Sequence, residues 1–366
     1  MAKRPKHLIR DNVHLNLRPV QACNKIFNFI LSPREPGKST CAYTLVYKMY
    51  RHRHLPSVIL VRQSVDITEE YIDSILDTIN KFLPPQRRLK FYYKQSGLEK
   101  GIVDIFTDKN KTKKIIRIQS LAIPKQRAKK MAINAYCLIM DEYVIDTSKG
   151  EKYLKEEVDR YKNVYETYQR YAVERGHQLK CYFFGNPYSI YTPYHIWKHI
   201  PLDQIKPGCF LVGPDYVLQA YQLKEELKKA ILERNPLFKF DDVYTRYAFG
   251  GVSINDERFN ILPRMPKGFK LKYIFRINER YMYIWRNTNS VNATISKWYV
   301  NTQENLIPTA KNIYSVDFNN LVEGTYLVTQ DIKFLFICLK EAVARRNIAY
   351  DSVESAYAIE QLYSMI

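Results

Sequence analysis

The sequence Gly37-Lys38-Ser39-Thr40 follows an apolar segment at residues 25–31 and precedes residues with helical spacing. A strand, a glycine turn, Lys-Ser and a helix together form a phosphate-binding loop, in which backbone N–H groups surround phosphates and the lysine reaches the terminal ones. A second apolar segment, residues 135–140, ends at Asp141 and Glu142. Because ATP hydrolysis needs both a phosphate loop and a carboxylate at the end of a neighbouring strand, the two motifs predict an ATP-hydrolysing α/β domain.

The motif residues have distinct expected roles. Gly37, Lys38, Ser39 and Thr40 are expected to bind the nucleotide, and the Ser39 hydroxyl also binds Mg²⁺. Asp141 is expected to hold Mg²⁺, while Glu142 acts as the general base that polarises the attacking water. Each motif by itself is a weak signal, because Gly-Lys-Ser arises by chance and acids often follow strands. The prediction depends on finding both in one alternating strand and helix pattern.

Asn186 follows another apolar segment, residues 179–184, and precedes Pro187. A polar side chain at this strand end is expected to contact the γ-phosphate or the attacking water and to sense hydrolysis. Asparagine is also common in an ordinary turn before proline. Both interpretations of Asn186 stay open at this point.

Strands and helices alternate in the first half of the chain, which predicts a mainly parallel sheet with ligands at the carboxyl ends of its strands. A charged helix is expected within residues 217–234. An antiparallel meander follows, with strands at residues 270–277, 281–285 and 297–301, and helices end the chain. We therefore expect a motor domain at residues 1–196, a helical linker at 197–240 and a smaller α+β domain at 241–366.

The net charge of +20 on 366 residues predicts contact with a polyanion. No apolar segment approaches the roughly 20 residues of a membrane span, so nucleic acid is preferred over a membrane as the partner. The densest basic segment, residues 125–130, is expected to contact the DNA backbone, although charge clusters are often only solvated. Its cations are Lys125, Arg127, Lys129 and Lys130. Six cysteines without CxxC spacing fit a reducing cytoplasm.

With these motifs in place, the chain resembles the DNA-packaging ATPases (encapsidation proteins) of small short-tailed bacteriophages of the phi-twenty-nine type, relatives of viral terminase large subunits. Ser32 replaces the first glycine of the phosphate loop and Arg34 lies within the loop, as is common in that family. The resemblance implies that both residues bind the nucleotide. Residues 163–170 resemble the helix that carries the family's trans-acting arginine, which implies that Arg170 is catalytic; Arg175 is the alternative.

The resemblance also implies an ASCE-type P-loop ATPase domain joined by a helical linker to a vestigial RNase H-like domain. The family works as a homo-oligomeric ring, pentameric by analogy, in the host cytoplasm at the portal of a procapsid. The ring drives double-stranded DNA inward, in some members with a packaging RNA. Sequence does not decide whether this chain needs that RNA.

The second domain is not expected to cut DNA. A working RNase H-type nuclease needs acids on its first strand to hold two metal ions, whereas residues 270–278 contain no acid. The cations of this region are expected to bind nucleic acid instead: Lys270, Lys272, Arg276 and Arg286. Metal-dependent cleavage of DNA would contradict this expectation.

Two other functions stay open. One is a related DNA-dependent ATPase, such as a terminase or a helicase. The other is a basic structural protein that binds nucleic acid without catalysis and whose Gly-Lys-Ser sequence is accidental.

Overall fold

The chain forms two compact units, Met1–Ser253 and Ile254–Ile366. The computed structural model describes residues 15–33, 37–94, 101–130, 132–146, 151–189, 192–201, 204–234, 259–277, 280–287, 297–303, 305, 312–315, 324–327, 330–345, 347–352, 354–356, 358–359 and 362.

Unit 1 contains an eight-stranded sheet with the spatial order β3-β4-β2-β5-β6-β1-β8-β7. The six inner strands are parallel, and β3 and β7 pair antiparallel at the two edges. The predicted α/β class with a mainly parallel sheet is therefore confirmed. The strands are β1 (Phe27–Leu31), β2 (Ser57–Val61), β3 (Ile102–Phe106), β4 (Lys114–Ser120), β5 (Cys137–Asp141), β6 (Lys180–Gly185), β7 (Phe210–Val212) and β8 (Tyr216–Ala220).

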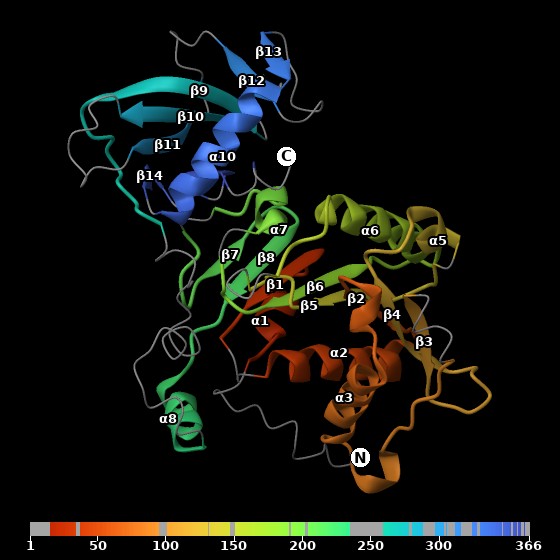
Figure 1. Ribbon diagram of the computed structural model, residues 1–366. Coiled ribbons are helices and arrows are strands. Elements are labelled where there is room, and N and C mark those ends of the chain that lie inside the picture. The colour runs from red at the N-terminus through yellow and green to blue at the C-terminus, as the bar shows by residue number, and fades with distance from the viewer. Residues whose placement is uncertain are drawn as a thin grey trace. The chain divides into compact units, whose positions relative to one another are not determined.

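Helices cover both faces of this sheet, with α2 and α3 on one face and α5, α6 and α7 on the other (Figure 1). Central strands buried on both faces need continuous apolar sequences, which is why β1 is buried along its whole length. No helix among the described residues has a long enough apolar stretch to cross a membrane. The helices of unit 1 are α1 (Arg18–Ala22), α2 (Lys38–Arg53), α3 (Glu69–Asn80), α5 (Lys125–Lys130), α6 (Glu157–Glu174), α7 (Pro193–Trp197) and α8 (Glu225–Arg234).

The described residues of the segment 197–240, namely 197–201 and 204–234, differ from the expected helical linker. They contribute β7 and β8 to the sheet of unit 1, and β8 pairs with β1 along its whole length. The helix expected within residues 217–234 begins only at Glu225, because Val217 and Leu218 are fully buried in β8. Strand β3 was not predicted either, since Asp104 interrupts its apolar sequence.

Unit 2 is an α+β unit, as expected, with a six-stranded sheet in the order β13-β12-β9-β10-β11-β14. Strands β9, β10 and β11 form the predicted antiparallel meander. The unit's main buried cluster joins Phe275 and Ile284 of the sheet to Leu339 of α10. The elements are β9 (Phe269–Ile277), β10 (Arg280–Asn287), β11 (Trp298–Gln303), β12 (Ile313–Ser315), β13 (Thr325–Leu327), α10 (Gln330–Ala344) and β14 (Ile348–Tyr350).

Candidate active site

The carboxyl ends of β1, β6 and β5 bring the predicted motif residues together. β6 lies between the other two strands, with Leu31 opposite Gly185 and Asp141 opposite Phe184. The backbone N–H of Ser32 donates to the Gly185 carbonyl (3.0 Å). Adjacent parallel strands have their carboxyl ends at the same end of the sheet, so the residues that follow these strands converge there.

Lys38 is the first residue of α2 and lies between the phosphate loop and the end of β6. Gly37 precedes it with φ 88°, a left-handed conformation that favours glycine. The Lys38 Nζ donates to the carbonyls of Ser32 (2.8 Å) and Pro33 (2.6 Å) and to Asn186 Oδ1 (2.7 Å). The Lys38 ammonium therefore lies close to the N-terminus of α2, and this arrangement suits the binding of a phosphate group.

Ser39 and Asp141 form the second pair of the site. The Ser39 hydroxyl donates to Asp141 Oδ2 (3.2 Å), and the Tyr43 hydroxyl donates to the same oxygen (3.4 Å). Mg²⁺ prefers oxygen ligands and commonly binds one or two carboxylates together with substrate phosphates. The Ser39 and Asp141 oxygens, which lie 3.2 Å apart, fit this ion.

Burial raises the pKa of Asp141 to about 6, and the neighbouring charge of Glu142 adds to the rise, while Lys38 and Ser39 act in the opposite direction. The carboxyl has a pKa near 4 in an unfolded chain. Folding therefore favours the protonated carboxyl. The stabilisation of the folded state by the protonated Asp141 carboxyl is fully present below about pH 4, and it is lost as the pH rises through about 6.

Replacing Asp141 by asparagine is accordingly expected to raise the melting temperature at pH 8 in the presence of a chelator. The amide keeps an acceptor oxygen for Ser39 but carries no buried charge. The gain should shrink as the pH falls towards 5, where the wild-type carboxyl becomes protonated. Thermal unfolding of both proteins at the two pH values measures the difference.

Asp104 provides a control, because its pKa is shifted in the opposite direction. Burial by itself would raise the pKa of Asp104, but hydrogen bonds and charges from Arg117 and Lys114 lower it overall. Asp104→Asn should therefore reduce stability at pH 8. An Asp141→Asn protein that melts below the wild type at pH 8 would contradict the expected sign.

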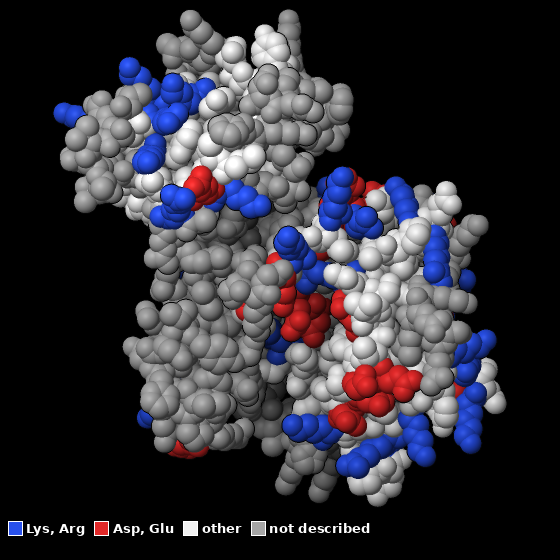
Figure 2. Space-filling view, viewed as in Figure 1, with Lys and Arg blue, Asp and Glu red and all other residues white. Residues whose placement is uncertain are grey.

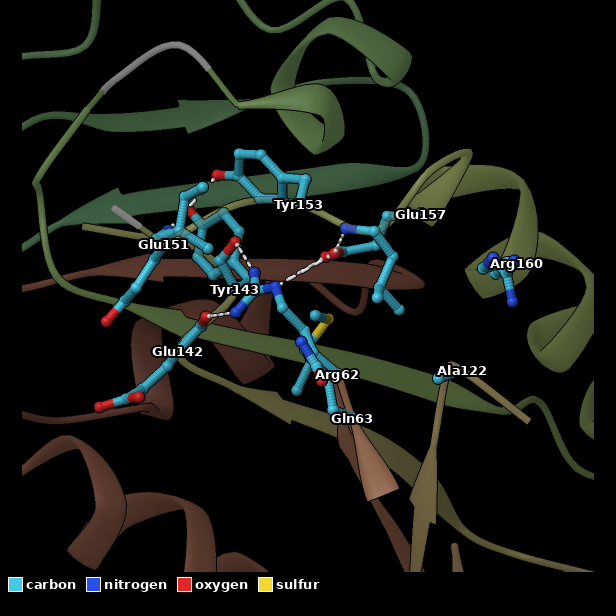
Figure 3. Close-up of polar contacts among 12 residues, drawn as sticks. Arg62, Gln63, Ala122, Glu142, Tyr143, Glu151, Tyr153, Glu157 and Arg160 are labelled. Atoms are coloured by element: carbon cyan, nitrogen blue, oxygen red, sulfur yellow. Dashed lines mark hydrogen bonds and ion pairs between the residues drawn. The ribbon is translucent and has the colours of Figure 1, made fainter. Parts of the chain in front are cut away.

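Glu142 lies directly after β5, is exposed and has φ 60°. Its neighbour Tyr143 donates its N–H to the Phe184 carbonyl (3.1 Å), which ties the turn to β6. The Arg62 guanidinium donates to the carbonyls of Glu142 (2.6 Å) and Tyr143 (2.7 Å). The Glu142 side chain extends away from Arg62 in Figure 3, so its carboxylate is not engaged by that arginine.

Three residues of this region were not among the predicted site residues, namely Arg62, Tyr43 and Glu157. Arg62 directly follows β2, so the rule that selected polar residues at strand ends could have found it. Tyr43 lies one helical turn after Ser39 on α2, and this spacing also gave a usable signal. Glu157 had no such signal, because several acids lie near the expected start of its helix.

The remaining residues predicted to bind the nucleotide or to act in trans are placed as follows. Thr40 lies in the first turn of α2, and Arg34 lies outside the described residues. Arg170 is exposed on α6, and Arg175 is exposed at the end of that helix. Exposed apolar side chains accompany Arg170 on α6: Tyr171 (39%) and Val173 (61%).

The basic segment at residues 125–130 forms the short helix α5. The helix forms because Ala128 packs in a buried cluster with Ile102 and Ile123. Lys125 is exposed and Arg127 is half-buried. The backbone of Lys129 and Lys130 ends this helix, and the side chains of both lie outside the described part of the chain.

The positive charge of unit 1 is unevenly distributed. Figure 2 shows acidic side chains gathered over α3, with lysines and arginines around them. The exposed acids of α3 are Glu69, Glu70, Asp73 and Asp77. This part of the surface repels a polyanion, so DNA contact is expected elsewhere on the chain.

The four cations of unit 2 that were predicted to bind nucleic acid do not form one surface. Lys270 and Arg286 are cross-strand partners, and Arg286 is also opposite Trp298, which belongs to the cluster under α10. Arg276 follows Phe275 of the same cluster, so it lies on the other face of the sheet. Lys272 falls where the register between β9 and β10 shifts. Regular alternation along β9 would place Lys270, Lys272 and Arg276 on one face of the sheet. The register shift moves Lys270 to the face opposite Arg276.

No protein-family model and no curated protein sequence matches the chain. The fold is nevertheless similar to solved structures of two bacteriophage motors. The TM-score is 0.63 against a chain of the viral genome packaging motor assembly of bacteriophage Phi-29, with 16% identity over 97% of this chain and 100% of that chain. For the DNA packaging motor of bacteriophage Phi-28 the TM-score is 0.54, with 16% identity over 92% and 94% of the two chains. The resemblance inferred from the sequence is confirmed at the level of the fold.

Proposed function

We propose that the chain is an ATP-driven double-stranded DNA translocase that packages a viral genome into a procapsid. One observation carries this proposal: Lys38, Ser39, Asp141 and Asn186 converge at the ends of three adjacent strands. The fold shared with two phage packaging motors supports the choice of DNA as the transported substrate.

In this mechanism, Lys38 and the backbone of the phosphate loop bind the β- and γ-phosphates of ATP. Ser39 and Asp141 would hold Mg²⁺, which would neutralise charge on the phosphate oxygens. Glu142 orients the attacking water and accepts its proton. Asn186 contacts Lys38 and thereby lies beside the γ-phosphate, where it reports hydrolysis to β6.

The proposed working form is a homo-oligomeric ring, pentameric by analogy, at the portal of a procapsid in the host cytoplasm. Closure around ATP and opening after hydrolysis would move DNA held by basic residues. The DNA contacts are assigned to α5 and to Lys270, Lys272 and Arg286, which are exposed on β9 and β10, whereas Arg276 is half-buried on the other face of that sheet. We assign no nuclease activity to unit 2, because its first strand carries no acid.

Assays with purified protein on double-stranded DNA test this function against its two rivals. A translocase should hydrolyse ATP faster with DNA and should displace a third strand bound to the duplex without separating the duplex. Release of single strands would indicate a helicase. Binding of DNA with neither ATP hydrolysis nor third-strand displacement would overturn the proposal in favour of a structural protein.

Arg170 is expected to complete the active site of a neighbouring subunit. Its exposed position on α6, beside the apolar side chains of Tyr171 and Val173, is suited to a subunit interface. Arg170→Ala should lower DNA-stimulated ATP turnover at least tenfold, because an arginine finger stabilises transition-state charge. Steady-state ATPase rates of the variant and the wild type measure this effect.

Mixing experiments distinguish action in trans from a local defect. Rings that combine Arg170→Ala with Lys38→Ala subunits contain some sites with an intact lysine and an intact neighbouring arginine. Partial recovery of ATP turnover is expected in these mixtures, with Arg175→Ala as the comparison variant. Failure of every mixture to recover would count against a shared site.

A further inference from the structure

The turn after β5 has an unfavourable backbone conformation at the proposed general base. Glu142 has φ 60°, where a residue with a Cβ atom is disfavoured. Other contacts must therefore stabilise this conformation. The direction of the Glu142 side chain depends on them, because the backbone sets where its Cα–Cβ bond points.

Arg62 supplies two of these contacts. Its Nη1 donates to the Glu142 carbonyl (2.6 Å) and its Nη2 donates to the Tyr143 carbonyl (2.7 Å), as Figure 3 shows. A guanidinium is planar and rigid, so bonds to two consecutive carbonyls fix the orientation of two consecutive peptide groups. The contact is with the backbone of the base, so Arg62 acts on the Glu142 carboxylate only through the main chain.

Glu157 in turn fixes Arg62. The Arg62 Nε donates to both carboxylate oxygens of Glu157 (3.2 and 3.1 Å). Glu157 is only 3% exposed, and it also accepts hydrogen bonds from the Tyr194 hydroxyl (2.8 Å) and the Leu154 N–H (2.8 Å). A buried ion pair with its hydrogen bonds satisfied holds one geometry, because any other arrangement leaves a desolvated charge unpaired.

The other side of the turn is also fixed. The Tyr143 hydroxyl and the His195 ring are joined by a hydrogen bond of 2.8 Å, and both side chains are fully buried. The turn thus lies between Arg62 at the end of β2 and His195 on α7. Its conformation is set by packing across the sheet rather than by the local sequence.

We propose that Arg62 is a positioning residue that directs the Glu142 carboxylate towards the attacking water. This inference rests on the proposed function, because Glu142 is a base only if ATP is hydrolysed. A purely structural role for the Arg62–Glu157 pair is the alternative. The two differ in whether a conservative change at Arg62 alters the chemical step alone or the stability of the whole unit.

Arg62→Lys separates these possibilities. Lysine keeps the positive charge beside Glu157, but its single ammonium does not reproduce the flat contact with two carbonyls. We expect kcat for ATP to fall roughly 10- to 100-fold, because a misplacement of about 1 Å can cost a factor of 10². The Kd for a fluorescent ATP analogue should stay within about twofold of the wild-type value, since Lys38 and Ser39 are untouched.

Arg160→Lys is the matched control. Arg160 lies on α6, and its guanidinium also donates to backbone carbonyls, those of Lys155 (3.0 Å) and Leu121 (3.5 Å). These carbonyls belong to other turns, so its replacement should leave kcat unchanged. Equal losses of kcat in the two variants would show a general effect of removing an arginine and would overturn the proposal.

A double-mutant cycle gives the decisive measurement. If Arg62 acts through Glu142, adding Arg62→Lys to Glu142→Gln should lower the single-turnover rate no further. Multiplied losses would overturn the proposal.

If circular dichroism shows that Arg62→Lys does not fold, Glu157→Gln replaces it. This variant is expected to have a reduced kcat and an unchanged nucleotide Kd. An unchanged kcat would contradict the inference. A wild type without ATPase activity overturns the proposed function together with this inference, whereas an active wild type and an unaffected Arg62→Lys overturn the inference alone.

Discussion

Glu142→Gln is expected to lower ATP turnover about 10³-fold while nucleotide binding stays within about twofold of the wild type. Glutamine has nearly the same shape as glutamate but does not accept the proton of the attacking water, and general-base catalysis typically contributes 10²–10⁴-fold. Binding should persist because Lys38, Ser39 and Asp141 are unchanged. Single-turnover hydrolysis of labelled ATP and equilibrium binding of a fluorescent nucleotide measure the two effects separately.

Glu156 offers a matched control for this substitution. It is also an exposed glutamate with a left-handed backbone (φ 56°), at the start of α6. Glu156→Gln removes the same charge from a similar backbone and should leave turnover unchanged. Normal hydrolysis by Glu142→Gln would remove Glu142 from its proposed role, and a loss of both binding and turnover would point to a structural defect.

Lys38→Ala is expected to abolish ATP hydrolysis, with and without DNA, and to weaken nucleotide binding about 10- to 100-fold. Charge-assisted hydrogen bonds to phosphate are among the stronger polar interactions, and alanine removes all of them at this position. The substitution also removes the link between the phosphate loop and Asn186 (2.7 Å). Steady-state hydrolysis and nucleotide titration measure the losses.

Lys48→Ala serves as the control, because Lys48 is an exposed lysine further along the same helix. It should hydrolyse ATP at the wild-type rate. DNA binding by Lys38→Ala should persist, which separates loss of the motor from loss of the partner. If Lys38→Ala hydrolyses ATP like the wild type, the Gly-Lys-Ser sequence is accidental and the structural-protein interpretation regains support.

The central strands and the clustering of the candidate catalytic residues were predictable because both follow from the local pattern of apolar and polar residues. The segment at residues 57–61 is largely apolar and lies between Pro56 and Arg62, and it forms β2 with those bounds. Asp141 and Asn186 lie at the end of such a segment, and Lys38 follows another one across the phosphate loop. Parallel strands must have their carboxyl ends at the same end of the sheet, and the structure places the ends of β5, β6 and β1 side by side.

The features that were not predictable depend on partners distant in the sequence. Residues 216–220 form β8 because β1 offers them an open edge, and nothing in their own sequence excludes a helix. The same holds for the pairing of Arg62 with Glu157, which joins the end of β2 to the start of α6. The separation of Lys270 from Arg276 onto opposite faces follows from a register shift between two strands. Sequence periodicity carries no information about such a shift.

The placement of β8 has a consequence for how the protein is made. β1 carries the phosphate loop and lies between β6 and β8, so one of its two edges stays open until the ribosome has translated residue 220. During that interval β1 presents unpaired N–H and C=O groups flanked by apolar side chains, which favours aggregation. A fragment that stops at residue 196 would retain this exposed edge permanently, although it contains every residue of the candidate active site.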